Sequence, residues 1–372
     1  MKIRTGCLRR ISSAGLGFLL LLSGGILWSP GAVFSEQKGD AAKAQAEEGM
    51  KFMDGAFWRA QVLEDLMPYW FDHVRDEEYG AFYMSLSRTW QPVPSWRRGW
   101  DKVPAMISRQ IFSFSTAYLL SGEDKYLQVA RKAVDYLLEY GWDKEYGGWF
   151  NLLTQTGAPK DTVKEASLQL YSNVGLAQYY LVTGDEQALS RVLQSVEILR
   201  TKAHDKEHDG YFMTLNRDLS VRDSTKAKHA HYGQGSLMPN LILATRDPDV
   251  LRFSEHLADL SIEHMMDPEG NWMLGFPTSF DPEWNYTPFI VEGTESIYLG
   301  ASSTAALFFL RLYHLSGEES YLKAGKALGD KLCRYGWDAD RGGWYSLVEK
   351  TPPHKLLPSQ KIWWWIQIYG SF

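Results

Sequence analysis

The chain has 372 residues, a formal net charge of −6 and 45% hydrophobic residues, a composition typical of a large globular protein. Its acidic balance, with no basic run beyond the first residues, argues against a nucleic-acid-binding protein. Aromatic residues make up 14% of the chain. Flat aromatic side chains can serve as platforms for sugars, although most of them are expected to pack in the core.

The first 35 residues have the pattern of an export signal. Basic side chains up to Arg10 precede an apolar stretch at 16–28, and Ser35 fits a cleavage site before Glu36. We therefore expect 1–35 to be a signal peptide, 36–50 to be a polar tether, and the protein to be periplasmic or secreted. The apolar stretch is short and broken by glycines, so no stable membrane span is expected after cleavage. An anchor that stays uncleaved is the alternative.

An aspartate-led corner then recurs five times along the chain. The corners run from Asp76 to Tyr83, Asp143 to Phe150, Asp205 to Phe212, Asp267 to Met273 and Asp338 to Tyr345. Their first aromatic residues are Phe82, Trp149, Tyr211, Trp272 and Trp344, at spacings of 67, 62, 61 and 72 residues. This period is longer than the roughly 20–50 residues of common solenoids and suits a helical hairpin with a long loop. The repeated aspartates are predicted to be caps and turn formers.

Two helices are predicted between successive corners. The pairs are 111–121 with 126–142, 164–183 with 187–204, and 302–316 with 321–337. The first helix of each pair is apolar over most of its circumference, which indicates a buried helix, and the second has one apolar stripe, which indicates a surface helix. Inner helices in a ring, wrapped by outer helices, predict an all-α toroid with the corners at one end.

We expect this toroid to be a single (α/α)6 domain over 51–372, with the last hairpin incomplete. A helix that starts near residue 359 reaches the end of the chain at Phe372, before an outer partner can follow. The apolar surface left uncovered there would favour association. A homodimer is therefore among the expected partners.

Four segments resemble the N-acylglucosamine 2-epimerase superfamily, which includes cellobiose 2-epimerases and mannose isomerase-like enzymes. They are Leu66–Ser87, Lys102–Tyr118, Lys164–Asp185 and Lys361–Gln367, the last similar to a Lys-x-x-Trp-Trp-x-Gln motif. The order of these motifs is more specific than any one of them. The resemblance covers about residues 58–372.

The resemblance implies a metal-free and cofactor-free reaction on a small sugar. A histidine removes the C2 proton of an open-chain aldose, and return of the proton from the opposite face at C2, or at C1, gives the epimer or the ketose. Arg109 matches the arginine that faces the sugar, and a fixed guanidinium suits a developing oxyanion. The matching helices place Gln169, Trp364, Trp365 and Gln367 as substrate-binding residues.

The histidine positions depart from the family pattern. Aligned on Leu241 and Asp247, the middle motif puts His229 where the family has Asn and Gly233 where it has His; a shifted register instead gives His231 and Gln234 the His-x-x-Glu spacing. We expect His229 and His231 to be the candidate bases and Gln234 a substrate contact. Because His229 and His231 lie two residues apart and no third ligand is evident, no metal site is expected.

A later motif, Glu292–Ile297, has Thr294 at the family's usual base position. Glu292 and Glu295 are expected at the start of the fifth inner helix, where an acid complements the helix dipole. Glu295 is nevertheless a candidate catalytic acid. Paired carboxylates also suggest an alternative function, a toroidal glycoside hydrolase. A third hypothesis is a sugar-binding protein without catalysis, which the threonine at the usual base position, Thr294, favours.

Overall fold

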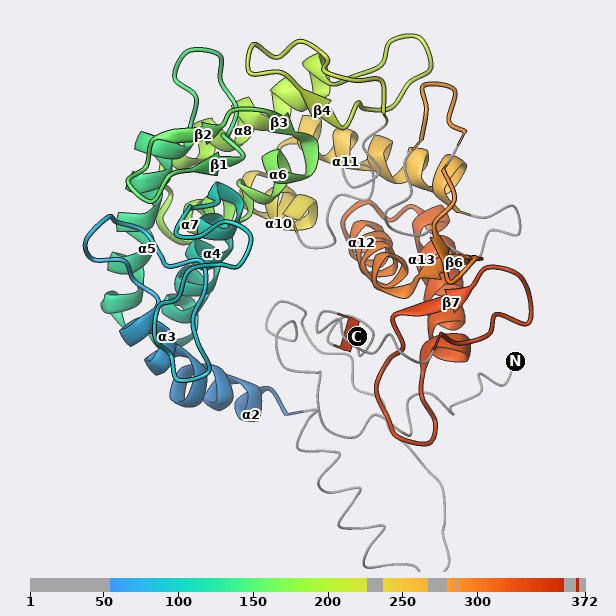
Figure 1. Ribbon diagram of the computed structural model, residues 1–372, viewed down its shortest axis with the longest axis horizontal. Helices are drawn as coiled ribbons and strands as arrows, with labels where there is room; N and C mark the ends of the chain where they lie inside the picture. The colour runs from blue at the N-terminus through green and yellow to red at the C-terminus, as the bar shows by residue number, and fades with distance from the viewer. Residues whose placement is uncertain (1–53, 226–236, 267–279, 286, 358–365, 368–372) are drawn as a thin grey trace, which may run out of the picture.

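The helices lie in two concentric layers around a ring (Figure 1). The computed structural model describes residues 54–225, 237–266, 280–285, 287–357 and 366–367. The inner layer consists of α4 (Pro104–Ser121), α6 (Ala166–Tyr171), α7 (Val174–Thr183), α10 (Leu237–Thr245) and α12 (Leu299–Ser316). The outer layer consists of α5 (Asp124–Tyr136), α8 (Glu186–Lys202), α11 (Pro248–Leu260) and α13 (Glu319–Lys331). This arrangement confirms the predicted all-α toroid.

Short π-helical segments end most of the outer elements. They are η4 (Leu137–Gly141), η5 (Ser261–Met265) and η6 (Leu332–Gly336), and the chain enters the ring through α2 (Gly55–Ala60), η3 (Gln61–Leu66) and α3 (Met67–His73). The segments η4 and η6 end two residues before the corner aspartates Asp143 and Asp338. In the expected last hairpin, only Ile366 and Gln367 belong to the described residues.

Tight turns join each inner helix to its outer partner. Gly122, Gly184 and Gly317 end α4, α7 and α12 in the left-handed conformation, with φ of 72°, 70° and 78°. An acidic residue follows, and the carboxylates of Asp185, Asp247 and Glu318 accept hydrogen bonds from the first turn of the next helix. A left-handed C-cap followed by an acidic N-cap reverses the chain within two residues.

One helix differs from its predicted extent. The inner helix expected over 164–183 is broken into α6 and α7 at Ser172 and Asn173. The Asn173 side chain accepts a hydrogen bond from the indole nitrogen of Trp149, at 2.8 Å. The break therefore places an amide against the corner tryptophan.

The four described corners share one conformation. Each is closed by a single antiparallel bridge, joining Arg75 to Phe82, Trp142 to Trp149, His204 to Tyr211 and Trp337 to Trp344. In each, one oxygen of the leading aspartate accepts from the backbone amides two and three residues later. The first aromatic residue of each of these corners is at most 3% exposed. The predicted structural role of the aspartates is confirmed there, and the Asp267 corner lies outside the described residues.

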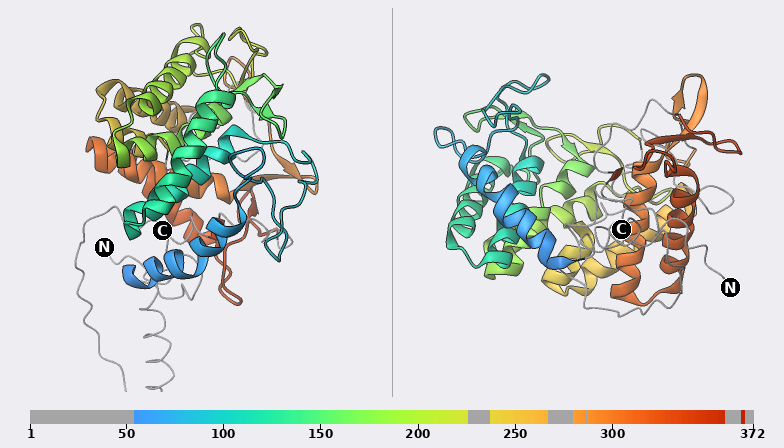
Figure 2. Two further views of the ribbon diagram at one scale, coloured as in Figure 1. Left: turned by 90° about the vertical axis from the view of Figure 1, so that its left-hand side faces the viewer. Right: turned by 90° about the horizontal axis from the view of Figure 1, so that it is seen from below.

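Short strands tie neighbouring corner loops together. The sheets pair β1 (Leu152–Leu153) with β2 (Pro159–Asp161), β3 (Lys164–Glu165) with β4 (Thr214–Leu215), and β5 (Ile290–Val291) with β6 (Thr294–Tyr298) and β7 (Leu347–Glu349). The pairs Lys102–Leu153, Lys164–Leu215 and Ile297–Val348 have the same sequence separation. Each joins the entry of an inner helix to the loop after the next corner. These strands and long loops lie along one end of the ring, seen from below in Figure 2.

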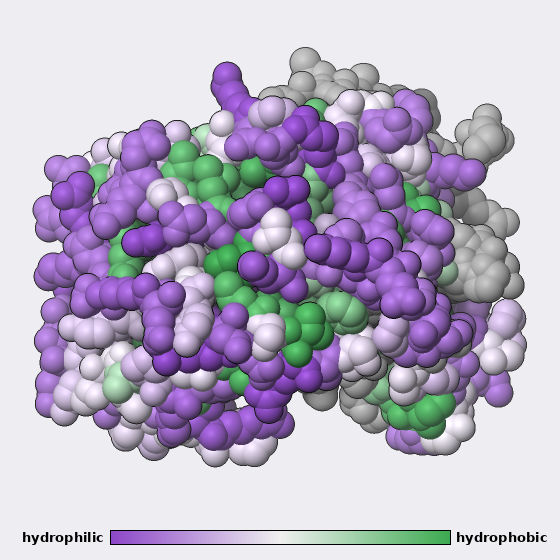
Figure 3. Space-filling view, turned by 90° about the horizontal axis from the view of Figure 1, so that it is seen from above, coloured by the Kyte–Doolittle hydropathy of each residue, from purple (hydrophilic) through white to green (hydrophobic). Residues whose placement is uncertain are grey.

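The core fills the space between the two layers. Fully buried side chains of one large cluster include Ile107 and Phe114 of α4, Leu176 of α7, and Phe308 of α12. The outer wall seen from above is mostly hydrophilic, with apolar side chains in small patches (Figure 3). This is the surface expected of outer helices that bury a single stripe. Of the described helices, none is both long and apolar enough to cross a bilayer.

Candidate active site

Arg109 lies on the inner helix α4, as its predicted role requires. Met106 is exposed, and Arg109 and Ser113 are partly exposed, at a spacing that puts all three on one face of α4, whereas Ile107, Ile111 and Phe114 are buried. Helix α4 belongs to the inner layer and packs against the outer helix α5 and the inner helix α7 (Figure 1). Arg109 is therefore in the layer where a substrate in the ring would lie.

The Arg109 guanidinium is held against an aromatic ring. Its Cζ lies 4.1 Å from the centroid of Tyr171, on α6, and Nη1 lies 3.7 Å from the sulfur of Met106. Such stacking leaves the N–H groups in the guanidinium plane free to bind an oxyanion. Within the described ranges no carboxylate pairs with Arg109. Tyr171 was not singled out in the sequence, although it lies in a segment that carries the family resemblance.

Gln169 occupies a different position from the one its expected role requires. Its side chain is 1% exposed, its Oε1 accepts from the Trp149 amide, and its Nε2 donates to the Trp149 carbonyl, both at 2.7 Å. Gln367 makes the same pair of bonds with Trp344, at 2.8 and 2.7 Å. The geometry therefore gives both glutamines the role of corner braces and offers no support for a sugar contact.

Two buried lysines stabilise the first two corners. Lys102 Nζ lies 2.8 Å from Asp76 Oδ2, and Lys164 Nζ lies 3.2 Å from Asp143 Oδ2, with all four side chains at most 1% exposed. Burial lowers the pKa of Lys164 to about 8, although the charge of Asp143 opposes the shift. Burial alone would raise the pKa of Asp143, but the hydrogen bond from Arg217 and the charge of Lys164 lower it overall. Both lysine side chains therefore pair with corner carboxylates, and we do not assign them a role in the sugar reaction.

The expected position of Glu295, at the start of the fifth inner helix, is wrong. Thr294 to Tyr298 form strand β6, and α12 begins only at Leu299. Glu292 lies in the turn between β5 and β6 with φ of 52°, and Glu295 Oε1 lies 2.7 Å from Lys350 Nζ. Neither glutamate is in the first turn of a helix. The segment is a strand because it pairs with β7, which follows about one repeat later.

The remaining candidates lie outside the described residues. They are His229, His231, Gln234, Trp364 and Trp365. Their proximity to Arg109 stays a prediction.

A family model described as "N-acylglucosamine 2-epimerase (GlcNAc 2-epimerase)" matches residues 82–368. The chain belongs to the N-acylglucosamine 2-epimerase family. This confirms the resemblance to the superfamily that the sequence motifs indicate.

Among curated relatives, the cellobiose 2-epimerase of Bacteroides fragilis is 27% identical over 60% of this chain and 58% of its own length. That of Eubacterium cellulosolvens is 31% identical over 45% of this chain and 39% of its own. The chain thus spans less than two thirds of the length of these relatives.

Solved structures are similar in fold. A D-mannose isomerase superposes with a TM-score of 0.66 at 19% identity, covering 78% of this chain and 74% of its own. The cellobiose 2-epimerase of Spirochaeta thermophila gives 0.58 at 20%, covering 84% and 92%. A family 76 glycoside hydrolase from a bovine Bacteroides thetaiotaomicron strain gives 0.56 at 14%, covering 76% and 58%. These likenesses confirm the (α/α)6 toroid fold.

Proposed function

We propose that the protein is a sugar isomerase or 2-epimerase that moves a proton through an enediolate. The observation that carries this proposal is the family match over residues 82–368. The position of Arg109 on the inner layer, stacked on Tyr171 and with no carboxylate partner among the described residues, supports it. Names of the relatives suggest cellobiose or mannose as substrates to test first.

In the proposed reaction, a base removes the proton at C2 of the open-chain aldose. The electrons of the C–H bond form the C1–C2 double bond, and the carbonyl electrons move onto O1. The guanidinium of Arg109 stabilises this oxyanion by donating hydrogen bonds whose strength rises as charge develops. The O2 hydroxyl proton passes to O1, and delivery of the C2 proton to C1, with O2 becoming the carbonyl oxygen, gives a ketose. Delivery to the opposite face of C2 restores an aldose with inverted configuration.

His229 or His231 is the proposed base. Neutral imidazole accepts a proton near neutral pH and returns it in the next step. Thr294, at the position where the family usually has its base, cannot take this role because a hydroxyl does not ionise near neutral pH. Transfer from C2 to C1 on one face needs a single base, whereas inversion at C2 needs groups on both faces. We therefore favour isomerisation over epimerisation.

Incubation with mannose, glucose, N-acetylglucosamine and cellobiose in heavy water tests the proposal. Deuterium at C2 of recovered aldose, or at C1 of a ketose product, supports proton transfer through an enediolate. Release of a new reducing end without deuterium incorporation would instead show a glycoside hydrolase. Binding without either change would show a sugar-binding protein. Chromatographic separation of ketose from epimer decides between the two forms of the proposed reaction.

The glycoside hydrolase alternative has weaker support from the geometry. Glu295 is engaged with Lys350, and Glu292 lies in an exposed turn rather than beside it on a helix face. An acid and a base in this class need carboxyl groups that face each other across a sugar, roughly 5–9.5 Å apart. The similarity to family 76 hydrolases is in fold alone.

We also propose that the protein is exported through the signal peptide at 1–35. The basic start and the apolar stretch of the first 35 residues support this. Fractionation of cells that express the full chain, with N-terminal sequencing of the product, tests it: a mature start at Glu36 is expected. A homodimer stays a prediction, which light scattering on the purified protein tests.

A further inference from the structure

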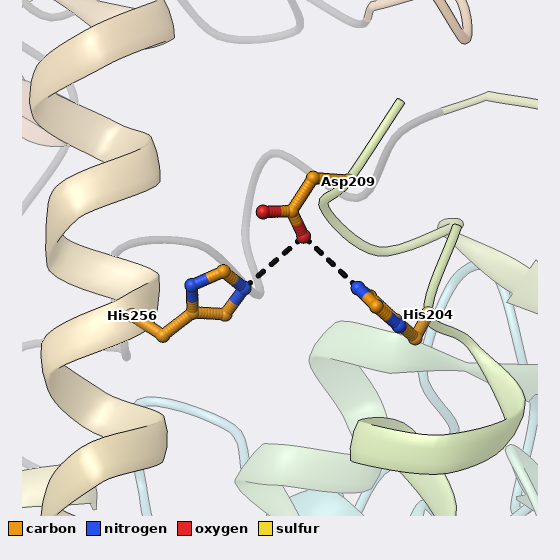
Figure 4. A group of neighbouring side chains, drawn as sticks. All are labelled: His204, Asp209 and His256. Carbon is orange, nitrogen blue, oxygen red and sulfur yellow. Dashed lines mark hydrogen bonds and ion pairs between the residues drawn. The ribbon is translucent and has the colours of Figure 1, made fainter. Parts of the chain in front are cut away.

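Two histidines and an aspartate meet on the outer layer of the toroid. Asp209 Oδ1 lies 2.9 Å from Nε2 of His204 and 3.2 Å from Nε2 of His256, and one ligand atom from each residue lies within 4.8 Å of the others (Figure 4). His204 and Asp209 belong to the third corner, and His256 lies on the next outer helix, α11. The side chains are 33%, 48% and 36% exposed, so an ion and its water ligands can reach them.

Asp209 departs from the conformation that its repeat position favours. It has φ of 60°, and the corresponding residues of the other described corners are Gly80, Gly147 and Gly342, with φ of 80°, 80° and 72°. Left-handed backbone favours glycine, and aspartate is one of the few other residues that tolerates it. A carboxylate at this position therefore has a conformational cost, which a role for its oxygen would offset.

The neighbouring repeat lacks all three groups. At the second corner the positions of His204 and Asp209 are taken by Trp142 and Gly147. His256 is the ninth residue after the Asp247 N-cap of α11, and the ninth after the Asp185 N-cap of α8 is Gln194. Trp142, Gly147 and Gln194 line a common groove. The three matching positions thus lie close together in both repeats. Only the repeat with the third corner has side chains that can bind a metal at all three positions.

We propose that His204, Asp209 and His256 form a binding site for a divalent transition-metal ion of the Zn²⁺ class. Imidazole nitrogen with one carboxylate oxygen suits Zn²⁺, Co²⁺ or Ni²⁺, whereas Mg²⁺ and Ca²⁺ prefer oxygen ligands alone. In tetrahedral zinc sites the ligand atoms are roughly 3.3 Å apart, so the three side chains need only small movements. Water completes the coordination.

The electrostatics of the cluster favour a cation. Burial alone would raise the pKa of the Asp209 carboxyl, but the hydrogen bond from the Gly210 amide and the two neighbouring histidines lower it overall. Metal ligation requires an ionised carboxylate and imidazoles without a proton on the ligating nitrogen, so binding at this cluster would release protons. Because the ligands come from two successive hairpins, a bound ion would fasten one to the next. This site is on the outer layer and does not depend on the sugar reaction of the inner face.

The test is calorimetric titration of the purified, chelator-treated full chain with Zn²⁺ at pH 7.5, alongside Co²⁺ titration followed by visible absorption. Two variants replace a cluster residue with the residue at the matching position of the neighbouring repeat. They are Asp209→Gly, which suits the left-handed backbone, and His256→Gln. His208→Ala, in the same corner but outside the cluster, is the matched control.

We expect one Zn²⁺ per chain and a Zn²⁺-dependent rise in Tm. Each cluster variant should weaken binding at least ~10-fold, since loss even of a group behind a ligand costs that much, and should reduce the rise in Tm at the same Zn²⁺ concentration. His208→Ala should bind as the wild type does. The proposal is overturned if the wild type takes up no ion, or if Asp209→Gly and His256→Gln bind Zn²⁺ and Co²⁺ as the wild type does. The latter result would assign binding to other residues.

Discussion

The side-chain amide of Gln169 forms two hydrogen bonds with the backbone of Trp149, accepting from its N–H and donating to its carbonyl. A single side chain thus satisfies both polar groups of a buried residue, as a strand partner would. The indole of the same tryptophan donates to Asn173. The inner helix therefore holds the corner by both backbone and ring, which explains why the corner tryptophan can be 0% exposed.

Replacing Gln169 should lower the free energy of unfolding. In Gln169→Ala, the Trp149 N–H and carbonyl lose their partner without gaining water, and each unsatisfied buried group costs ~1–3 kcal/mol. We expect the free energy of unfolding, from urea titration, to fall by about 2–6 kcal/mol. Gln187→Ala, on the exposed face of α8, should change it by less than ~0.5 kcal/mol. A stable Gln169→Ala variant with a raised KM for sugar would return this residue to the substrate site.

A second stability prediction concerns the contact of α4 with α7. A Cβ at Gly175 would lie 1.9 Å from the Ser108 carbonyl oxygen, and the Gly175 amide donates to Ser108 Oγ at 2.8 Å. Gly175→Ala must therefore force the two inner helices apart, and we expect a loss of at least ~3 kcal/mol, the upper range for overpacking. Urea unfolding measures it.

Gly329, in the outer helix α13, is the matched control for that variant. A Cβ there meets nothing within 4 Å, so Gly329→Ala should stabilise the helix by ~0.5–1 kcal/mol. Equal effects of the two substitutions would contradict the close approach of α4 and α7.

The repeat made the toroid predictable, because a corner motif and two helix patterns recur in the same order. Pairings between repeats were not predictable in this way. The segment from Thr294 to Tyr298 contains an apolar run that a helix could also carry, and its partner β7 lies about one repeat further along the chain. The sequence pattern therefore places Glu295 on a helix. The contact of Gln169 escapes the sequence for a related reason, since its partner is the backbone of Trp149 and backbone groups leave no pattern in a sequence.

The outer-layer cluster shows what a comparison of repeats could have found. Aligning the five corners on their first aromatic residue puts Asp209 where the other four have glycine, which is a visible departure in the sequence. The contribution of His256, on the following outer helix, required the helices to be placed in space. Sequence patterns locate the unusual residue, and packing locates its partners.

The buried pair of Lys164 and Asp143 predicts a pH dependence of stability. The pKa of Lys164 in the folded protein, about 8, is below the usual lysine value of 10.5. Between these values the unfolded chain binds more protons, so the contribution of Lys164 to stability should rise with pH and be least favourable below pH 8. Between pH 7 and pH 10, the free energy of unfolding of the wild type should rise relative to that of Lys164→Met, by up to ~3 kcal/mol. A flat or opposite trend in urea titrations would contradict the buried charged lysine.

Arg109 should matter for turnover far more than for folding. In Arg109→Lys a point charge replaces the planar donor array, so we expect C2 exchange in heavy water to fall ~100–1000-fold, as for loss of an oxyanion donor. Its stacking on Tyr171 is worth only ~0.5–1 kcal/mol, so urea unfolding should change little. Arg191, whose Cζ lies 5.2 Å from the Trp142 ring on the outer layer, is the matched control. If Arg191→Lys lowers exchange as much, or Arg109→Lys leaves it intact, Arg109 does not bind the enediolate.

The choice of base is tested by His229→Ala and His231→Ala. If one of these imidazoles takes the C2 proton, its removal should lower the exchange rate ~100–10,000-fold, the usual contribution of a general base, while the other variant retains turnover. His208→Ala, at the third corner on the outer layer, should exchange at the wild-type rate. Because one base can serve C2 and C1 on a single face, the wild type should yield ketose in excess over the C2 epimer. Full exchange in both histidine variants, or efficient inversion at C2 by the wild type, would show that groups other than His229 and His231 carry the proton.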